Sequence, residues 1–425
     1  MRVVACYVPG VLSVMSNMRG RWRLISAAMA AFLLIGCGST AAGIPGPVQH
    51  LSMNLTGSSI SFGLTLLDRL LAEQGAGNVF ISPLSATIAL SMAASAAQGD
   101  TRAAMLQTLG LDPTIDPSSE LRQTIQRLNQ SDANAQVELA PAVWAQDGLQ
   151  LSPAYVAKLR DDYQAELGNL NFMDPNAPDV VNRWVDAKTH HKITRLVDQF
   201  DPSIVGYLVN ATYFHALWAT EFKPLSSPVA FRQFTGSTTS PPMMHRDESV
   251  IELHTSNYVA ELLPYKGGRF SAVLILPANV LSPSEFSTFL TPTVWAQTMG
   301  AFHDAAGPTL ADKCKGGAMV ICDGTLQMPK FKLDYQKDLT STLHSMGMPI
   351  PADLPDFCGG CYVSTVVQAT RLEVDEKGTT AAAATGVAVA TALRMPTIVD
   401  RPFAFALIDN ATDAPLFLGA IGNLA

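Results

Sequence analysis

One stretch near the C-terminus, Gly378 to Leu393, has a composition that few folds can use. It contains no charged residue, no proline and no aromatic residue, and consists almost entirely of glycine, alanine, threonine and valine. Its alternate positions are small or β-branched, so one face of a strand could enter a packed sheet without steric conflict or buried charge. These positions are Thr379, Ala381, Ala383, Thr385, Val387 and Val389. The same residues could remain in water as a loop, and the alanines would also favour a helix. The residues alone do not decide between two interpretations. In one, the segment can be either a loop or a strand; in the other, it forms a helix.

The rest of the chain predicts an α+β fold. Hydrophobic residues make up 48% of the 425 residues and charged residues only 15%, so the chain can bury a large core and is not disordered. The periodicity predicts helices at 60–72, 83–97 and 182–196, a strand at 79–81, a hairpin at 258–277, and strands at 403–408 and 416–421. Helices dominate the first part and strands the last, without βαβ alternation.

The N-terminus has the pattern of an export signal. Arginines within 19–23 precede an uncharged apolar run at 24–35. This run is too short to span ~30 Å of hydrocarbon and fits a signal peptide comprising residues 1–36. The residues before it do not fit the basic start of a signal, which suggests that translation begins at Met15 or Met18.

The signal ends at a cysteine. Leu34-Ile-Gly-Cys37 resembles a bacterial lipobox, which implies cleavage before Cys37 and lipidation of its thiol. A plain signal peptide with an incidental cysteine is the alternative. Residues 37–57 predict a flexible tether with a span on the order of 25 Å, and residues 58–425 the folded domain. We therefore expect a lipoprotein of the cell envelope, on the periplasmic face or the cell surface, or a secreted protein if Cys37 is not lipidated.

Four further cysteines lie within one part of the chain: Cys314, Cys322, Cys358 and Cys361. An exported location is oxidising, so one or two disulfides are the favoured interpretation, and the sequence does not choose among the pairings. A zinc site is disfavoured because Cys314 and Cys322 are too far apart for a Cys-x₂₋₄-Cys knuckle. A redox-active Cys-Gly-Gly-Cys is the third alternative. We predict no metal and no cofactor.

Charge and motifs argue against two classes of function. The chain has 28 basic and 36 acidic residues; four of the basic residues lie in residues 1–36, so the part beginning at Cys37 carries 24 basic against 36 acidic residues. Nucleic acid is therefore not an expected partner. The motifs of serine hydrolases, β-lactamases, zinc proteases and P-loop enzymes are absent. The pair His190-His191 is better explained as a solvated helix end, and we do not expect an enzyme.

A series of short motifs follows in order along the chain. They are Asn78-Val-Phe-Ile-Ser-Pro-Leu-Ser85, Asn210-Ala-Thr-Tyr-Phe-His-Ala-Leu-Trp218 with Phe222, Pro242-Met-Met-His245, Glu261-Leu-Leu-Pro-Tyr265, Met328-Pro-Lys-Phe331, Arg401-Pro-Phe403 and Leu416-Phe-Leu-Gly419. Each motif is weak alone, but their order, together with Glu376-Lys-Gly-Thr-Thr-Ala-Ala-Ala-Ala-Thr385, resembles the serpin family of serine protease inhibitors from about Ser59 to Ala425. The N-terminal signal suggests a bacterial lipoprotein-type member.

The resemblance implies a fold and a mechanism. The serpin fold has three β-sheets with about nine helices and an exposed reactive-centre loop on a metastable monomer. A protease cleaves this loop, the hinge segment inserts into the large sheet as a new strand, and the acyl-enzyme is dragged along and distorted. The expected partner is thus a serine protease held in a covalent acyl-enzyme complex, with no cofactor involved.

The hinge implied by the resemblance meets the physical demands of insertion. A charged residue facing inward would bury an ion and slow insertion, whereas this segment is uncharged after Lys377. The residues concerned are Glu376, Gly378, Thr379, Thr380, Ala381, Ala382, Ala383 and Ala384. We therefore expect an inhibitor; the alternative is a non-inhibitory serpin that acts as a surface carrier or interaction protein.

Other positions match the machinery that opens the sheet. Ser82, Ser85 and Asn210 match the central shutter, and Trp218, Lys330 and Glu376 match the breach where insertion begins. Three features depart from the family pattern. Gln368 stands where many members have a shutter histidine and can still hydrogen-bond Asn210, but it removes any pH-dependent contact. His191 replaces a common glycine after a helix, and Cys358 and Cys361 lie in a loop usually free of cysteine.

The reactive bond is placed by counting. The usual loop length from Gly378 gives Ala392, and counting back from Phe403 gives Thr391. A small residue there suits an elastase-like protease, whereas Leu393 would suit a chymotrypsin-like enzyme and Arg394, with a longer loop, a trypsin-like one. We rank Ala392 first and Thr391 second.

Overall fold

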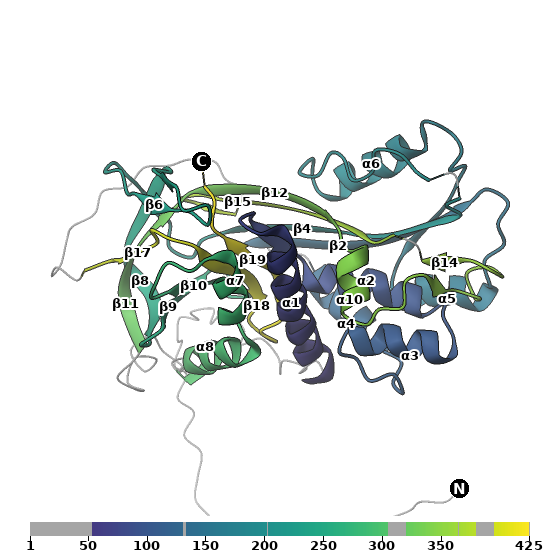
Figure 1. Cartoon of the computed structure of the whole chain (residues 1–425), viewed down its shortest axis with the longest axis horizontal. Coiled ribbons are helices and arrows are strands. Elements are labelled where there is room, and N and C mark those ends of the chain that lie inside the picture. Colours follow the sequence, from purple (N-terminus) through teal and green to yellow (C-terminus); the bar gives the residue numbers. More distant parts are fainter. Residues whose placement is uncertain are drawn as a thin grey trace, which may run out of the picture. The chain divides into compact units, whose positions relative to one another are not determined.

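The computed structural model describes residues 53–130, 133–201, 203–304, 320–363, 365–379 and 395–424 (Figure 1). Several predicted features lie outside these residues: the signal peptide, Cys37, Cys314, the hinge residues Thr380, Ala381, Ala382, Ala383 and Ala384, and the reactive-bond candidates Thr391, Ala392, Leu393 and Arg394. Within the described ranges, no helix combines the length and apolar character needed to cross a membrane.

The described part of the chain contains nine helices. They are α1 (Met53–Gln74), α2 (Pro83–Ala94), α3 (Gly99–Thr108), α4 (Ser118–Leu128), α5 (Pro153–Asp161), α6 (Ala177–Lys188), α7 (Pro283–Phe289), α8 (Pro292–Asp304) and α10 (Thr340–Ser345). Most precede the strands that make up the C-terminal half, as the sequence predicted.

A six-stranded sheet carries the features that matter for function. Its strands are β12 (Phe331–Asp338), β15 (Val367–Val374), β16 (Gly378–Thr379), β4 (Gly206–Leu217), β2 (Ala135–Gln146) and β3 (Glu166–Leu170), in this spatial order. The pairs are antiparallel except β2 with β3. In Figure 1, α6 lies on one side of this sheet and α2 on the other.

A nine-stranded sheet forms the second large element. Its main path is β1 (Val79–Ile81), β19 (Pro415–Ile421), β18 (Phe403–Asp409), β10 (Phe270–Pro277), β9 (Tyr258–Pro264), β8 (Met243–His254), β11 (Val320–Pro329) and β17 (Thr397–Ile398), and β5 (Lys223–Leu225) joins at β8. One half of β8 pairs with β5 and the other half with β9. The two smaller sheets of the expected fold are therefore continuous here.

Two short hairpins complete the described strands: β6 (Phe231–Arg232) with β7 (Thr238–Thr239), and β13 (Ala352–Asp353) with β14 (Tyr362–Val363). The α+β class with about nine helices is confirmed in the described residues, and the three expected sheets correspond to the six-stranded sheet and the two halves of the nine-stranded sheet that share β8. The predicted hairpin, the strand at 79–81 and the two C-terminal strands are confirmed as well.

Helix α2 is the centre of the core. All of its side chains except that of Ala89 are buried, because it packs between α1, α3, β4 and β19. Its alanines and serines allow this close approach on every side, and Pro83 occupies the first helical position, where the missing N–H costs nothing. The helix ends at Ala94, three residues earlier than predicted.

The helix predicted at 182–196 is wrong beyond Lys188, where α6 ends. His190 and His191 have φ values of 49° and 62°, which no helix continues through. The side chain of Asn182 accepts hydrogen bonds from the backbone of Leu196 and Val197 at 2.7 and 3.0 Å, so the chain folds back along α6. Apolar periodicity at 193–197 reflects packing against the sheet rather than helix.

Candidate functional site

The six-stranded sheet has a gap between β4 and β15. At one end of the gap, Thr379 of β16 pairs with Val374 of β15 and with Ala216 of β4. The hinge residues Gly378 and Thr379 therefore already lie between the two strands. Beyond them, β4 and β15 line a cavity of about 990 Å³. Residues of both strands and of α2 face it: Ser85, Ala89, Leu208, Asn210, Val367 and Gln368. The gap is therefore the position of one further strand, of which only the residues of β16 are in place in the described part of the chain.

The hinge enters the sheet through a close backbone approach. At Gly378 an added Cβ would lie 2.1 Å from the carbonyl oxygen of Ala216, so only glycine fits between the strands. The side chain of Thr379 is 2% exposed. Its hydroxyl is 2.9 Å from the hydroxyl of Tyr265, and its carbonyl oxygen accepts a 2.8 Å hydrogen bond from Nδ1 of His215.

Tyr265 is the polar group that faces the hinge from the nine-stranded sheet side. It is completely buried, and this burial raises its pKa above the ordinary value, so the hydroxyl remains protonated. Its ring stacks on that of Trp218, with centroids 4.4 Å apart and planes 9° apart. A protonated hydroxyl against Thr379 favours the inserted position of the hinge, because expulsion would take away the hydrogen-bond partner of a buried hydroxyl.

The three predicted breach residues lie together. The indole N–H of Trp218 donates to the carbonyl oxygen of Asp375 at 2.9 Å, and the backbone N–H of Trp218 donates to that of Lys377 at 2.8 Å. Nζ of Lys330 lies 2.9 Å from Oε1 of Glu376. Both of these side chains are partly exposed, so the ion pair contributes little. The backbone hydrogen bonds hold the turn before the hinge.

The shutter residues connect α2 to both sides of the gap. On one side, the hydroxyl of Ser85 donates to the carbonyl oxygen of Asn210 on β4 at 3.0 Å. On the other, Oε1 of Gln368 on β15 accepts from the N–H of Ser82 at 3.1 Å, and Nε2 donates to the carbonyl oxygen of Ser82 at 2.8 Å. The hydroxyl of Ser82 donates to the carbonyl oxygen of Leu416 at 2.7 Å.

Gln368, which the sequence leaves able to hydrogen-bond Asn210, uses its amide for Ser82 instead. A carboxamide presents a donor and an acceptor side by side, which matches the N–H and C=O of one residue, and Gln368 binds Ser82 in this way. Across the gap, Oδ1 of Asn210 is buried, and among the described residues it has no hydrogen-bond partner. The shutter is therefore polar on both sides, but its two sides do not touch through these side chains.

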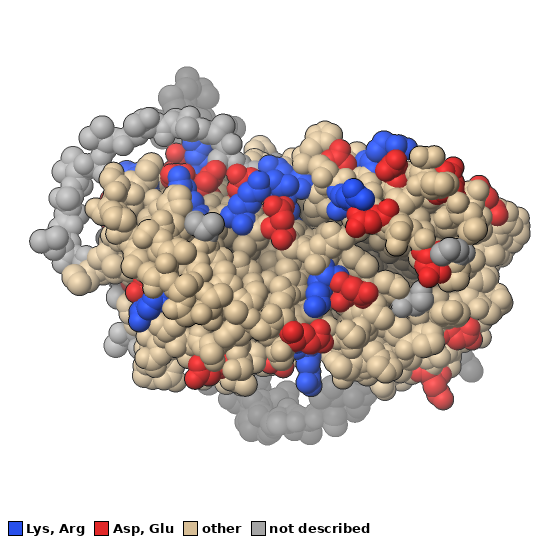
Figure 2. All heavy atoms as spheres, turned by 45° about the horizontal axis from the view of Figure 1, so that its top comes forward, with Lys and Arg blue, Asp and Glu red and all other residues tan. Residues whose placement is uncertain are grey.

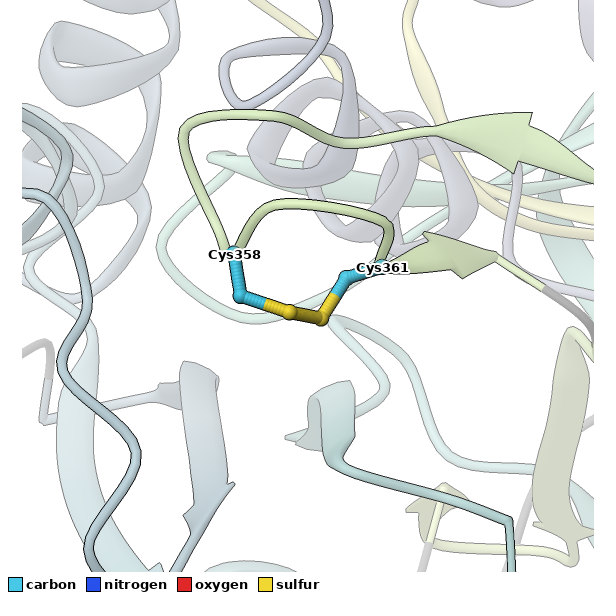
Figure 3. Close-up of a disulfide and its surroundings, with 2 residues drawn as sticks. All are labelled: Cys358 and Cys361. Atoms are coloured by element: carbon cyan, nitrogen blue, oxygen red, sulfur yellow. A yellow bond between two sulfur atoms is a disulfide. The ribbon is translucent and has the colours of Figure 1, made fainter.

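A disulfide lies at the far end of the cavity from the hinge. The Sγ atoms of Cys358 and Cys361 are bonded to each other, with Cα atoms 5.2 Å apart (Figure 3). Both residues line the cavity. Cys322 lies on β11. Among the described residues, no group of three or more His, Cys, Asp or Glu side chains could hold a metal ion.

The sequence predicted that Trp218, Lys330 and Glu376 belong to one site, and that Ser82, Ser85 and Gln368 belong to another. It did not predict the groups that contact the hinge. Tyr265 belongs to a recognised motif, and a buried tyrosine there requires a partner for its hydroxyl. Nothing in the sequence connects His215 to the hinge. His190 and His191 lie past α6 and are exposed, so the prediction that this pair is solvated is consistent with their positions.

Comparisons with known proteins agree with this geometry. A family model described as Serpin (serine protease inhibitor) matches residues 58–424. Iripin-3 of Ixodes ricinus is 33% identical over 396 residues, which cover 87% of this chain and 95% of the relative. Leukocyte elastase inhibitor A of Mus musculus is 28% identical over 384 residues, covering 86% and 98%. The native-state crystal structure of the thermophilic serpin tengpin has a TM-score of 0.73 and 28% identity, covering 88% of this chain and 94% of that one. The chain described here belongs to the serpin family.

Proposed function

We propose that this serpin inhibits serine proteases by suicide-substrate trapping. A protease cleaves the loop that follows the hinge, the hinge extends into the gap between β15 and β4, and the acyl-enzyme is carried along before it can hydrolyse. One observation carries the proposal: Gly378 and Thr379 already lie between β15 and β4, and a cavity continues the same strand position beyond them.

The register of β16 supports insertion of the whole segment. Each further hinge residue would pair one residue earlier on β4 and on β15, so Thr385 would lie opposite Asn210 and Gln368. Because side chains alternate, Thr385 would face the same side as Thr379, toward the core. Its hydroxyl would then reach the polar shutter, where Oδ1 of Asn210 has no partner among the described residues. The remaining inward positions are apolar.

The test is to mix the protein with a serine protease and look for a covalent complex that survives SDS. Thr379→Arg should convert the inhibitor into a substrate, because the guanidinium would enter a position that is 2% exposed and cost several kcal/mol. Thr379→Ser keeps the hydroxyl and should still inhibit. Complex formation by the arginine variant at an unchanged yield would contradict the insertion step.

We propose an elastase-like target, with chymotrypsin-like enzymes as the second choice. The small residues Ala392 and Thr391 fit a narrow specificity pocket, whereas Leu393 fits a wider apolar one. The likeness to leukocyte elastase inhibitor A, whose name states its target, supports this order. Sequencing the fragment released after protease challenge identifies the scissile bond and tests inhibition in one experiment.

The non-inhibitory alternative, a surface carrier or interaction protein, gives a different result in the same assay. Such a protein is cleaved by elastase, chymotrypsin, trypsin and subtilisin without a covalent complex. Its thermal stability also does not rise after the loop is nicked, because no strand inserts. These two results together would replace the inhibitor proposal.

We propose further that the protein is an exported monomer anchored through a lipid on Cys37, and that Cys358 and Cys361 form a disulfide in that oxidising compartment. Expression with labelled fatty acid should label the wild type and leave Cys37→Ser unlabelled and released from membranes. Labelling that persists in the serine variant would contradict the anchor, while leaving the inhibitor proposal intact.

A further inference from the structure

The turn that contains the disulfide, residues 354–361, connects the two sides of the gap at its far end. On one side, the ring of Phe357 lies so close to Gly206, the first residue of β4, that an added Cβ there would be 2.1 Å from Cζ. On the other, the chain leaves Cys361 and enters β15 at Val367. We call residues 354–361 the disulfide turn.

The disulfide turn is fixed to the body of the protein by hydrogen bonds. The N–H of Asp356 donates to the carbonyl oxygen of Ala96 at 3.1 Å, the N–H of Ser152 donates to that of Asp356 at 3.3 Å, and Nε2 of Gln98 donates to Oδ1 of Asp356 at 3.1 Å. Within the turn, the N–H of Leu354 donates to the carbonyl oxygen of Cys361 at 2.8 Å. The turn is therefore anchored to the segments after α2 and before α5.

The two cysteine residues differ in exposure. Cys361 is 7% exposed and belongs to the hydrophobic core, whereas Cys358 is only half-buried, and Gly359 and Gly360 beside it are exposed. Figure 3 shows the sulfur–sulfur bond closing the base of the turn formed by these glycines. A thiolate in solution can thus approach Sγ of Cys358, and Cys361 is the leaving group.

We propose that the Cys358–Cys361 disulfide is a redox-sensitive site at which a dithiol reductant controls how readily the gap opens. The reductant's thiolate attacks Sγ of Cys358 and displaces the Cys361 thiolate, which takes up a proton. The second thiol of the reductant then displaces Cys358, so that the protein gains two thiols and the reductant becomes a disulfide. This inference rests on the proposed insertion mechanism.

Reduction acts on the gap through Phe357. Opening the gap separates β4 from β15, and β4 is held against the disulfide turn at Gly206. The disulfide closes the part of the turn that follows Phe357, so after reduction hydrogen bonds alone hold the turn in place. The reduced turn can therefore yield more readily when β4 moves. We expect the native form to convert to the inserted form about fivefold faster after reduction, which is less than the full loop-closure effect of so short a ring.

The test uses the protein with Cys314→Ser and Cys322→Ser, so that only one pair remains among the cysteines that follow Cys37. The oxidised and dithiothreitol-treated proteins are incubated just below the thermal midpoint, and samples are run on native gels in urea, where only the inserted form stays folded. Hydrogen exchange at Gly206 and Val367 is measured in parallel. A control with Cys358→Ser and Cys361→Ser added should convert quickly with or without reductant.

Equal conversion rates and equal hydrogen exchange in the oxidised and reduced proteins would overturn the proposal. So would alkylation of Cys358 and Cys361 before any reductant is added, since no disulfide would then exist. These outcomes are independent of the protease assay: a protein that forms no covalent complex but exchanges faster at Gly206 when reduced would overturn the inhibitor proposal and support the redox site.

Discussion

The hydrogen bond between the hydroxyls of Tyr265 and Thr379 predicts how firmly the hinge is held in the sheet. Tyr265→Phe removes one member of this 2.9 Å pair and leaves the hydroxyl of Thr379 in a site that is 2% exposed. The loss of a buried neutral hydrogen bond removes about 1 kcal/mol. Local opening of the hinge should therefore become about fivefold more frequent.

Hydrogen–deuterium exchange measures this opening without a protease. The amides of Gly378 and Thr379 should exchange about fivefold faster in Tyr265→Phe, while those of β10 should be unchanged. Tyr335→Phe is the matched control, since its hydroxyl lies 3.2 Å from Oε1 of Gln74, away from the hinge. Thr379→Val should reproduce the effect, and combining it with Tyr265→Phe should add little. Unchanged exchange in Tyr265→Phe would refute the role assigned to this contact.

Three other substitutions test separate features. His191→Gly should raise the stability by about 1 kcal/mol in chemical denaturation, because φ is 62° at this position and glycine adopts it without strain; a loss of stability would contradict this reason. Gln368→Leu removes two buried hydrogen bonds to Ser82 and should lower the thermal midpoint by an amount equivalent to about 2 kcal/mol; an unchanged midpoint would show that they contribute nothing. Burial, and then the facing Glu252, raise the pKa of Glu261 well above its ordinary value of 4.5. The stability that comes from protonated Glu261 is therefore complete below pH 4.5 and is lost as the pH rises toward its folded-state pKa. Glu261→Gln should flatten this decline in a series of melting curves, and an identical decline in both proteins would assign it to another group.

Much of the fold could be predicted from local patterns. The hairpin at 258–277 and the C-terminal strands follow from apolar runs separated by turn residues, and the structure confirms them. The helix at 182–196 was predicted wrongly because its apolar residues keep helical spacing through 196. The side chain of Asn182 accepts a hydrogen bond from Leu196, where the chain returns along the helix. A contact between residues so far apart cannot be predicted from the periodicity of apolar residues.

The candidate site was predictable as a set of residues but not as a set of contacts. The family resemblance selected Ser85, Asn210 and Gln368, and all three line the cavity at the gap. The sequence could not tell which partner Gln368 uses, because the N–H and C=O of Ser82, the N-cap residue of α2, compete for its amide and their positions depend on tertiary packing. The contact between Tyr265 and the hinge joins residues 114 positions apart in the chain.

The two hinge residues already between β15 and β4 bear on the kinetics of strand insertion. Forming the first cross-strand pairs is the costly nucleation step of any new strand, and under the proposed mechanism it would be complete before cleavage, because Gly378 and Thr379 are already paired. Insertion would then proceed by propagation from one end, reaching the level of Asn210 after six further residues, about 20 Å along the strand. Gly206 would be reached last. A substitution near Gly378 should therefore change whether insertion begins, and one near Gly206 should arrest a strand that is already mostly paired.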